Sequence, residues 1–318
     1  MLFQKEHLWQ IILLFTHWRI KMDYYICSTS VIDNLHFSNG DVKKNVAGGA
    51  GIYALAGARL WHESTKLICG AGNNYAATFS KWYRDNHLTM DYLKFVNEKT
   101  PINNVHYFDD GERIEIPEYG EDHYKKFEVT VDDILPLLDH SCGIYIFRNT
   151  ASDFWLPILA NHHKSAKILW EIAADACEND NLPNVREICQ SIDVLSINLS
   201  EAKKLLQVET EVDAIKELKQ LNVPLVFLRL GKKGQTMITE KNTIFVPSFD
   251  KGNVVDVTGG GNSSSGAVLV GYCEKRSLLK IGRMASLSAS MCLSQYGVPK
   301  EIDSFQPNAS HLLKEGWY

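Results

Sequence analysis

The sequence has little that would place it in a membrane or outside the cell. Its apolar stretch near the amino terminus covers only residues 8–15, whereas a helix that crosses a bilayer needs about 20 apolar residues. The stretch also lacks the basic flank and the small-residue cleavage site of a secretory signal. The seven cysteines are odd in number and none belongs to a Cys-x-x-Cys pair, so we expect free thiols in a reducing compartment. These absences predict a cytoplasmic protein without a membrane partner.

The chain also lacks a basic stripe, internal repeats and linkers. It carries 33 Lys and Arg against 38 Asp and Glu, a formal net charge of −5, which argues against nucleic acid as a partner. Its 318 residues are 45% hydrophobic and 22% charged, a composition typical of a globular chain with a large core. We predict one domain over residues 22–318. Residues 1–21 are predicted to be a dispensable extension or the product of an upstream start codon. The alternative is an amphipathic anchor at a membrane interface.

Short apolar runs alternate with helical patterns along the chain. This alternation predicts an α/β fold with a central, mostly parallel sheet and helices on both faces. The predicted strands cover residues 24–28, 66–69, 143–147, 168–172, 194–197, 224–228, 234–239 and 242–246. The predicted helices cover residues 51–61, 76–86, 153–162, 184–190, 200–206, 212–221, 262–274 and 277–295. Residues 35–45 and 101–119 break the alternation and predict a small antiparallel β lid.

A polar, glycine-rich loop precedes the predicted helix at residues 262–274. It reads Asp-Val-Thr-Gly-Gly-Gly-Asn from Asp256 to Asn262. Three successive glycines can turn their amides toward one point, and a helix start adds partial positive charge there. The sequence therefore predicts an anion site, best suited to phosphate.

Other polar residues fall where predicted strands end, which is where ligands collect in α/β sheets. Alone, each has an ordinary explanation, because Asn-x-x-Glu is most often a helix cap and Gly-Gly a turn. The groups are Asp33, Gly48-Gly49, Glu171, the Asn198-x-x-Glu201 motif, and the segment from Arg229 to Gly234.

Taken together and in this order, these motifs resemble the ribokinase-like (PfkB-type) family of carbohydrate and nucleoside kinases, over about residues 23–298. The stretch from Ala47 to Ala54 looks like the family's first signature, and Asp256 to Asn262 looks like the second, usually Asp-Thr-Thr-Gly-Ala-Gly-Asp. The resemblance implies the family's fold and transfer of the ATP γ-phosphate to an alcohol group of a small sugar or nucleoside.

The resemblance also assigns roles to residues. The family's base position corresponds to Asn262, and the anion hole to Gly259, Gly260 and Gly261. The acceptor would be held by Asp33, Gly48, Gly49, Tyr53 and Arg113. The nucleotide would contact Asn198, Glu201, Gly231, Gly234, Asp256, Thr258 and Ser288, with Ala285 and Ala289 beside the adenine. Glu201 would reach magnesium through water. The implied cofactors are ATP and Mg²⁺, with a monovalent cation as a further candidate, and the implied partners are a small acceptor and a second copy bound through the lid.

The sequence departs from the family's pattern on the acceptor side. An amide at Asn262 cannot take up the proton that the usual aspartate accepts, although this departure resembles a divergent branch, first named for maintaining a killer virus in yeast, that reads Gly-Gly-Gly-Asn. Tyr53 stands where sugar kinases often carry Asn, and Glu171 lies in Trp-Glu-Ile where an Asp-Pro-Asn type of turn is common. We expect weakened transfer that Asn262→Asp would raise.

Two alternatives stay open. One is a catalytically silent pseudokinase that binds nucleotide or sugar and acts through partners. The other is an unusual acceptor, such as a nucleoside stacked on Tyr53. Asp256, Glu171 and Asp33 are the carboxylates that could replace the base, and the sequence does not choose among them.

Overall fold

The structure is a computed structural model that describes residues 23–108, 113–163, 165–249 and 254–316. The sequence predictions for residues 1–21 and for Asp110 to Glu112 in the lid lie outside these ranges. Within them, no helix is long and apolar enough to cross a membrane.

The main sheet has eight strands in the order β14-β13-β12-β11-β10-β9-β1-β4. From β4 to β12 all neighbours are parallel, and the β13–β14 hairpin continues the edge antiparallel to β12. The strands are β1 (Asp23–Cys27), β4 (Thr65–Ile68), β9 (Ser141–Arg148), β10 (Lys167–Ile172), β11 (Val194–Asn198), β12 (Leu225–Arg229), β13 (Gly234–Ile238) and β14 (Thr243–Pro247).

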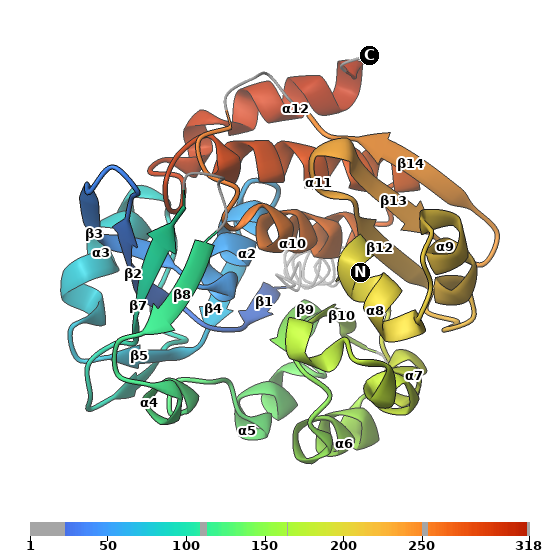
Figure 1. Ribbon diagram of the computed structural model, residues 1–318, viewed down its shortest axis with the longest axis horizontal. Helices are drawn as coiled ribbons and strands as arrows, with labels where there is room; N and C mark the ends of the chain where they lie inside the picture. The colour runs from blue at the N-terminus through green and yellow to red at the C-terminus, as the bar shows by residue number, and fades with distance from the viewer. Residues whose placement is uncertain (1–22, 109–112, 164, 250–253, 317–318) are drawn as a thin grey trace, which may run out of the picture.

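Helices cover both faces of this sheet, as the sequence predicts (Figure 1). The face toward α2 (Ala50–Arg59), α3 (Tyr75–Asp85), α10 (Gly260–Cys273) and α11 (Leu278–Leu293) forms one hydrophobic cluster. The opposite face packs on α5 (Val131–Ile134), α6 (Ser152–Asn161), α7 (Leu182–Cys189), α8 (Leu199–Leu206) and α9 (Glu211–Lys219). Side chains of each strand alternate between the two clusters, because successive residues of a strand point to opposite faces.

Small residues bring α2 and α10 into close contact. A Cβ atom on Gly266 would lie 2.1 Å from the backbone oxygen of Ala54, and one on Gly57 would lie 1.9 Å from that of Ser263. Neither position tolerates a side chain without movement of a helix. This packing fixes the start of α10, and with it the glycine loop, over the carboxyl ends of the central strands.

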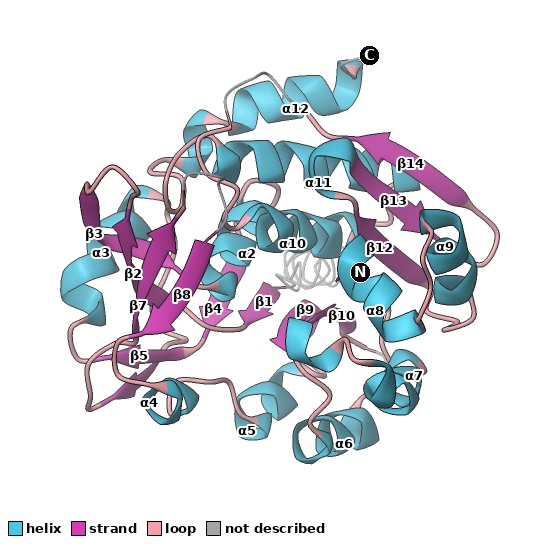
Figure 2. Ribbon diagram, viewed as in Figure 1, coloured by secondary structure: helices cyan, strands magenta, loops and turns pink. Residues whose placement is uncertain are grey.

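A second sheet of four strands stands beside the main sheet, at the left of Figure 2. Its order is β3-β2-β7-β8, antiparallel except for the central β2–β7 pair, which is parallel. The strands are β2 (Val31–His36), β3 (Val42–Gly48), β7 (Ile102–Tyr107) and β8 (Arg113–Pro117). The lid thus starts four residues earlier than expected, and Asp33 lies within a lid strand instead of after β1.

The fold class is as predicted, and every predicted helix and strand of the main layers is present within a few residues. The remaining elements carry weaker patterns and were not predicted: β5 (Gly70–Gly72), β6 (Lys94–Val96), α4 (Glu121–Lys125), α5 and α12 (Gln306–Glu315).

Candidate active site

Alternation along the strands brings a set of polar side chains to one place. In β12, Leu225 and Phe227 pack on the α10 side, so Arg229 two residues later faces the same way. In β10, Leu169 places Glu171 on that side by the same rule. Both strands end at the start of α10, so a cation and a carboxylate meet the glycine loop there.

The glycine loop wraps closely over its neighbours. Gly259 adopts φ +77° as the residue before α10, and a Cβ atom there would lie 2.1 Å from the ring of Tyr53. A Cβ atom on Gly261 would lie 2.2 Å from Nη1 of Arg229. Glycine is required at Gly259 by its φ and by the Tyr53 ring, and a side chain at Gly261 would displace the Arg229 guanidinium. That guanidinium therefore lies directly beside the amides expected to hold phosphate.

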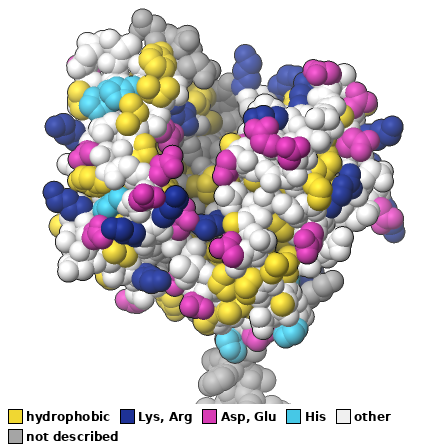
Figure 3. All heavy atoms as spheres, turned by 60° about the horizontal axis from the view of Figure 1, so that its bottom comes forward, with side chains coloured by type: hydrophobic (Ala, Val, Ile, Leu, Met, Phe, Trp, Pro, Cys, Tyr) yellow, Lys and Arg dark blue, Asp and Glu magenta, His cyan; other side chains and the backbone are white. Residues whose placement is uncertain are grey.

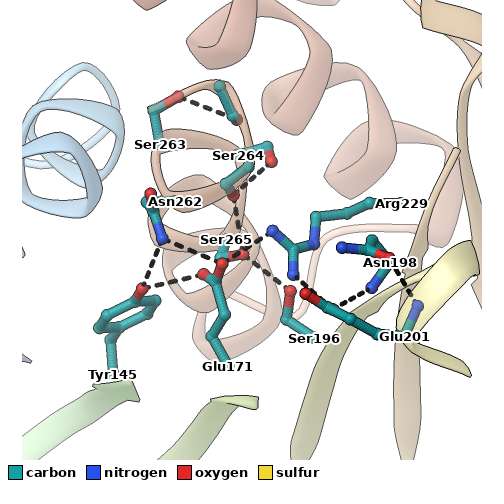
Figure 4. A network of polar contacts seen from close by, with 12 residues as sticks. Tyr145, Glu171, Ser196, Asn198, Glu201, Arg229, Asn262, Ser263, Ser264 and Ser265 are labelled. Carbon is teal, nitrogen blue, oxygen red and sulfur yellow. Dashed lines mark hydrogen bonds and ion pairs between the residues drawn. The ribbon is translucent and has the colours of Figure 1, made fainter. Parts of the chain in front are cut away.

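Asn262, in the first turn of α10, is tied to a buried carboxylate (Figure 4). Its Nδ2 donates to Oε1 of Glu171 at 3.0 Å and to the hydroxyl of Tyr145 at 3.5 Å. Glu171 is 1% exposed and also accepts from Arg229 Nη1 at 2.8 Å and from the Tyr145 hydroxyl at 2.9 Å. Burial and the Glu171 charge raise the pKa of Tyr145 well above its usual value, so this tyrosine stays a hydrogen-bond donor.

Asn198 and Glu201 form a capping box at the start of α8. Oδ1 of Asn198 accepts from the Glu201 amide at 2.8 Å, and Oε2 of Glu201 accepts from the Asn198 amide at 2.9 Å. Glu201 also pairs with Nη2 of Arg229 at 3.5 Å. Burial raises the pKa of Glu201, although Arg229 opposes the shift. Arg229 therefore bridges the helix cap and the Asn262 network.

A cavity of about 400 Å³ opens beside the glycine loop. It is lined by Gly260 and Gly261 of α10, by Gly231 and Gly234 at the start of β13, and by residues of α11 and α12. The part of α11 that faces it comprises Ser286, Leu287, Ala289, Ser290, Met291 and Leu293, followed by the C-cap residue Ser294. Small residues on one wall and free space of this size suit a purine base.

Ser288 does not face this cavity, which corrects its assignment to the nucleotide. The residue is fully buried, and its hydroxyl donates to the Gly57 oxygen at 3.0 Å and accepts from the Trp61 indole at 2.9 Å. Ser288 therefore joins α11 to α2. Ala285 is likewise packed in the core between helices and sheet, whereas Ala289 lines the cavity.

The lid faces the other side of the same loop. The Tyr107 hydroxyl, from β7, donates to Oδ2 of Asp256 at 3.1 Å and lies 3.2 Å from the Thr258 hydroxyl. Asp256 in turn accepts from the amide and hydroxyl of Thr258 at 2.9 and 2.7 Å. Asp256 and Thr258 thus shape the loop and join it to the lid, and neither lines the cavity.

Asp33 is a buried carboxyl with an unused oxygen. It is 6% exposed, and within the described ranges no hydrogen-bond partner meets its Oδ1. A Cβ atom on Gly48 would lie 1.8 Å from its Oδ2, so glycine makes room for the carboxyl. Burial, with Glu115 and Asp256 nearby, raises the pKa of Asp33 to about 8 in spite of Arg113. Gly49 follows with φ +93° as the N-cap residue of α2.

Arg113 and Tyr53 both lie within electrostatic reach of Asp33. Arg113 of β8 lies within electrostatic reach of Asp33 and Tyr107 and pairs with Glu115 at 3.4 Å. Tyr53 is 2% exposed, packs in the core formed by α2 and α11 and lies against Gly259. Its ring is therefore covered by the loop and offers no open face for stacking a base.

Viewed from below, the surface is hollowed between the lid side at left and the side with α7 to α9 at right, and acidic and basic side chains border the hollow (Figure 3). Within the described residues, no group of three His, Cys, Asp or Glu side chains could hold a metal by itself. Magnesium keeps most of its waters and needs few protein ligands, so the Glu201 carboxylate beside the phosphate cradle fits a contact through water.

Sequence reasoning gave no role in the site to Tyr145 and Tyr107, and it noticed Arg229 only as the first residue of the polar segment that ends at Gly234. Arg229 carried a signal, since a cation at the end of a buried strand in an α/β sheet is seldom without a partner. Tyr145 sits in the middle of an apolar run, and its pairing with Glu171 depends on strand register, which the sequence does not show.

Comparisons with known proteins agree with this geometry. Residues 13–303 match the family described as pfkB family carbohydrate kinase. Protein MAK32 of Saccharomyces cerevisiae is 25% identical over 319 residues, 85% of this chain and 84% of that protein. The structure of adenosine kinase from Sinorhizobium meliloti superposes with a TM-score of 0.74 at 16% identity, over 92% of this chain and 99% of that chain. Arabidopsis thaliana ribokinase, complexed with ribose and ATP, superposes with a TM-score of 0.70 at 21% identity, over 92% and 99% of the two chains. The chain therefore belongs to the pfkB family of carbohydrate kinases.

Proposed function

We propose that this protein transfers the γ-phosphate of ATP to an alcohol group of a small sugar or nucleoside. The observation that carries the proposal is that one loop borders two distinct binding regions. Its Gly260 and Gly261 line the cavity that suits a nucleotide, while its Asp256 and Thr258 contact the lid over Asp33. A phosphate on the loop would thus lie between a nucleotide and an acceptor. The ribose and ATP in the Arabidopsis ribokinase structure belong to the same two ligand classes.

The phosphates would lie on the amides of Gly259, Gly260 and Gly261, next to Arg229. These amides and the guanidinium offset charge on the transferred group, which is the main catalytic requirement of phosphoryl transfer. Magnesium, when bound, would add positive charge that offsets the phosphate charge, and Glu201 would hold one of its waters.

The acceptor would lie under the lid with a hydroxyl donating to the unused Oδ1 of Asp33. Gly48 and Gly49 leave room there for a ring to approach the backbone. Closure of the lid through Tyr107 would exclude water and so protect ATP from hydrolysis.

In the reaction the acceptor oxygen bonds to the γ-phosphorus, and the bond from that phosphorus to the bridging oxygen breaks with its electron pair going to ADP. Asn262 can orient the attacking hydroxyl but cannot keep its proton, which passes to a phosphate oxygen or to water after the new bond forms. Loss of a general base lowers a rate by about 10²–10⁴-fold, so we expect slow transfer.

A pseudokinase is the second candidate, and one observation favours it. The NH₂ group of Asn262 is held by Glu171, itself 1% exposed, so no free carboxylate faces the attacking hydroxyl from this network. Such a protein would bind nucleotide and acceptor without turnover and act through a partner.

The two candidates are separated by incubating the protein with MgATP and a panel of sugars and nucleosides, with product detected by mass spectrometry. Phosphorylated acceptor from the natural protein, absent from Asp33→Asn, supports the kinase. Saturable MgATP binding with no product from any acceptor supports the pseudokinase.

A further inference from the structure

The hydrogen bonds around Glu171 settle which way the Asn262 amide points. An ionised carboxylate can only accept hydrogen bonds, so the atom of Asn262 that lies 3.0 Å from Oε1 of Glu171 must be the NH₂ group. Figure 4 shows the amide oxygen on the opposite side, away from Glu171. Asn262 therefore presents an oxygen outward, as an aspartate would.

The carboxylate that an aspartate would place at position 262 is instead supplied by Glu171, which lies buried beside Asn262. Glu171 is buried and receives three hydrogen bonds, from Arg229 at 2.8 Å, from Tyr145 at 2.9 Å and from Asn262 at 3.0 Å. These three donors, one of them the guanidinium, supply the hydrogen bonds and the opposite charge that a buried carboxylate requires. A negative charge on the NH₂ side of an amide makes its oxygen a stronger hydrogen-bond acceptor.

We propose that Glu171 is a positioning residue for Asn262, and that the two form one unit in which the site's carboxylate has moved from position 262 to position 171. The inference rests on the proposed phosphotransfer and names the residue that orients the attacking hydroxyl in it. Glu171 fixes the amide with its oxygen toward the acceptor, and Arg229 fixes Glu171. None of the side chains of Glu171, Asn262, Arg229 and Tyr145 passes a proton in this arrangement.

This arrangement changes what Asn262→Asp would do. An aspartate at position 262 would lose the donor to Glu171 and place a second carboxyl about 3 Å from the first, with only Arg229 to neutralise both. Two carboxyls so close raise the pKa of one of them, so the pair holds a shared proton to a higher pH than a lone aspartate would. With that proton bound, the pair takes up a second proton only at a much lower pH than a free carboxylate, so position 262 is then a weaker base. The increase in transfer rate that the sequence predicts for Asn262→Asp therefore requires a second substitution, Glu171→Gln, which removes the competing carboxylate charge.

The test compares transfer rates at pH 7 for the natural protein, Asn262→Asp, Glu171→Gln and the double variant. We expect Glu171→Gln to lower kcat about tenfold or more with little change in the KM for ATP. We expect Asn262→Asp to be no faster than the natural protein, and the double variant to exceed Asn262→Asp at least about tenfold. Ser196→Ala is the matched control, because it removes a buried hydrogen bond to Ser265 without touching Asn262. An Asn262→Asp protein as fast as the double variant would overturn the inference.

A second readout does not depend on catalysis. In Asn262→Asp the groups that face the new carboxyl are Glu171, Tyr145 and Arg229, with Glu201 behind Arg229. A shared proton favours the folded state only while it is bound, so the Tm of Asn262→Asp should fall relative to that of the double variant as the pH rises from 5 to 9. A Tm difference that is flat across this range would refute the pairing. Failure of all four proteins to transfer phosphate would refute the proposed function and leave this thermal test to decide the inference.

Discussion

Replacing Arg229 by Met tests the charge arrangement at the centre of the site. The guanidinium is the cation that contacts Glu171, at 2.8 Å, and it also pairs with Glu201 at 3.5 Å. Without it, Glu171 at 1% exposure keeps the Tyr145 and Asn262 hydrogen bonds but loses its guanidinium partner. Breaking a buried ion pair by removing one partner costs about 3–5 kcal/mol, and we expect Arg229→Met to lose that much unfolding free energy.

The corresponding thermal shift follows from chain length. An unfolding entropy of about 2.1 cal/mol/K per residue gives ~670 cal/mol/K for 318 residues. A loss of about 3–5 kcal/mol then lowers Tm by roughly 4–8 °C. Scanning calorimetry measures this shift.

Two comparisons make the prediction specific. The double variant Arg229→Met with Glu171→Gln removes both charges, so its Tm should return most of the way toward that of the natural protein. Lys81→Met breaks an exposed pair with Asp85, and its Tm should barely change. The reasoning fails if Arg229→Met is as stable as Lys81→Met, or if the double variant is as unstable as Arg229→Met.

Three further predictions concern the acceptor side, the helix packing and the cavity. Burial raises the pKa of Asp33 to about 8, so kcat/KM for the acceptor should rise with pH up to about 8, and Asp33→Asn should abolish this rise. Because the pKa is higher in the folded state than in the unfolded state, the Tm of the natural protein relative to that of Asp33→Asn should fall between pH ~4 and about 8. A flat profile in both measurements would contradict the burial of this carboxyl. Gly57→Ala places a Cβ atom 1.9 Å from the Ser263 oxygen, so denaturant unfolding should show a loss of about 1–3 kcal/mol or more, and an unchanged midpoint would mean that α2 and α10 are not packed as described. Ser290→Trp fills part of the cavity and should weaken MgATP binding about tenfold or more by calorimetry, with undiminished affinity as the opposing result.

The fold was predictable because most of its elements carry strong local patterns. Buried parallel strands such as β11 and β12 read as continuous apolar runs, and small residues marked α2 and α10 as closely packed helices. The lid was harder to delimit, because β2 carries Asp33 and Asn34 in its middle and reads as the end of β1 followed by a loop. The parallel β2–β7 pair joins segments about 70 residues apart, a pairing that no local pattern encodes.

Site residues could be predicted where they belong to a contiguous sequence motif. They could not be predicted where their contacts depend on strand register or on which face of a helix they occupy. The glycine loop and Gly231 could be found because spacing along the chain sets their geometry. Ser288 could not be placed, because one step along α11 turns a side chain by about 100°, which moves a residue from the cavity to the α2 interface. Glu171 was noticed but not understood, since its partners come from β9, β12 and α10.

The most direct test of the kinase account is a single-turnover experiment with the natural protein in excess over labelled MgATP and a saturating acceptor chosen from the panel. The account predicts that label leaves ATP slowly, appears on the acceptor in equal amount, and stays on ATP when Asp33→Asn replaces the natural protein. Label that remains on ATP, while binding of MgATP and acceptor is demonstrated in the same samples, would contradict phosphotransfer and favour the pseudokinase.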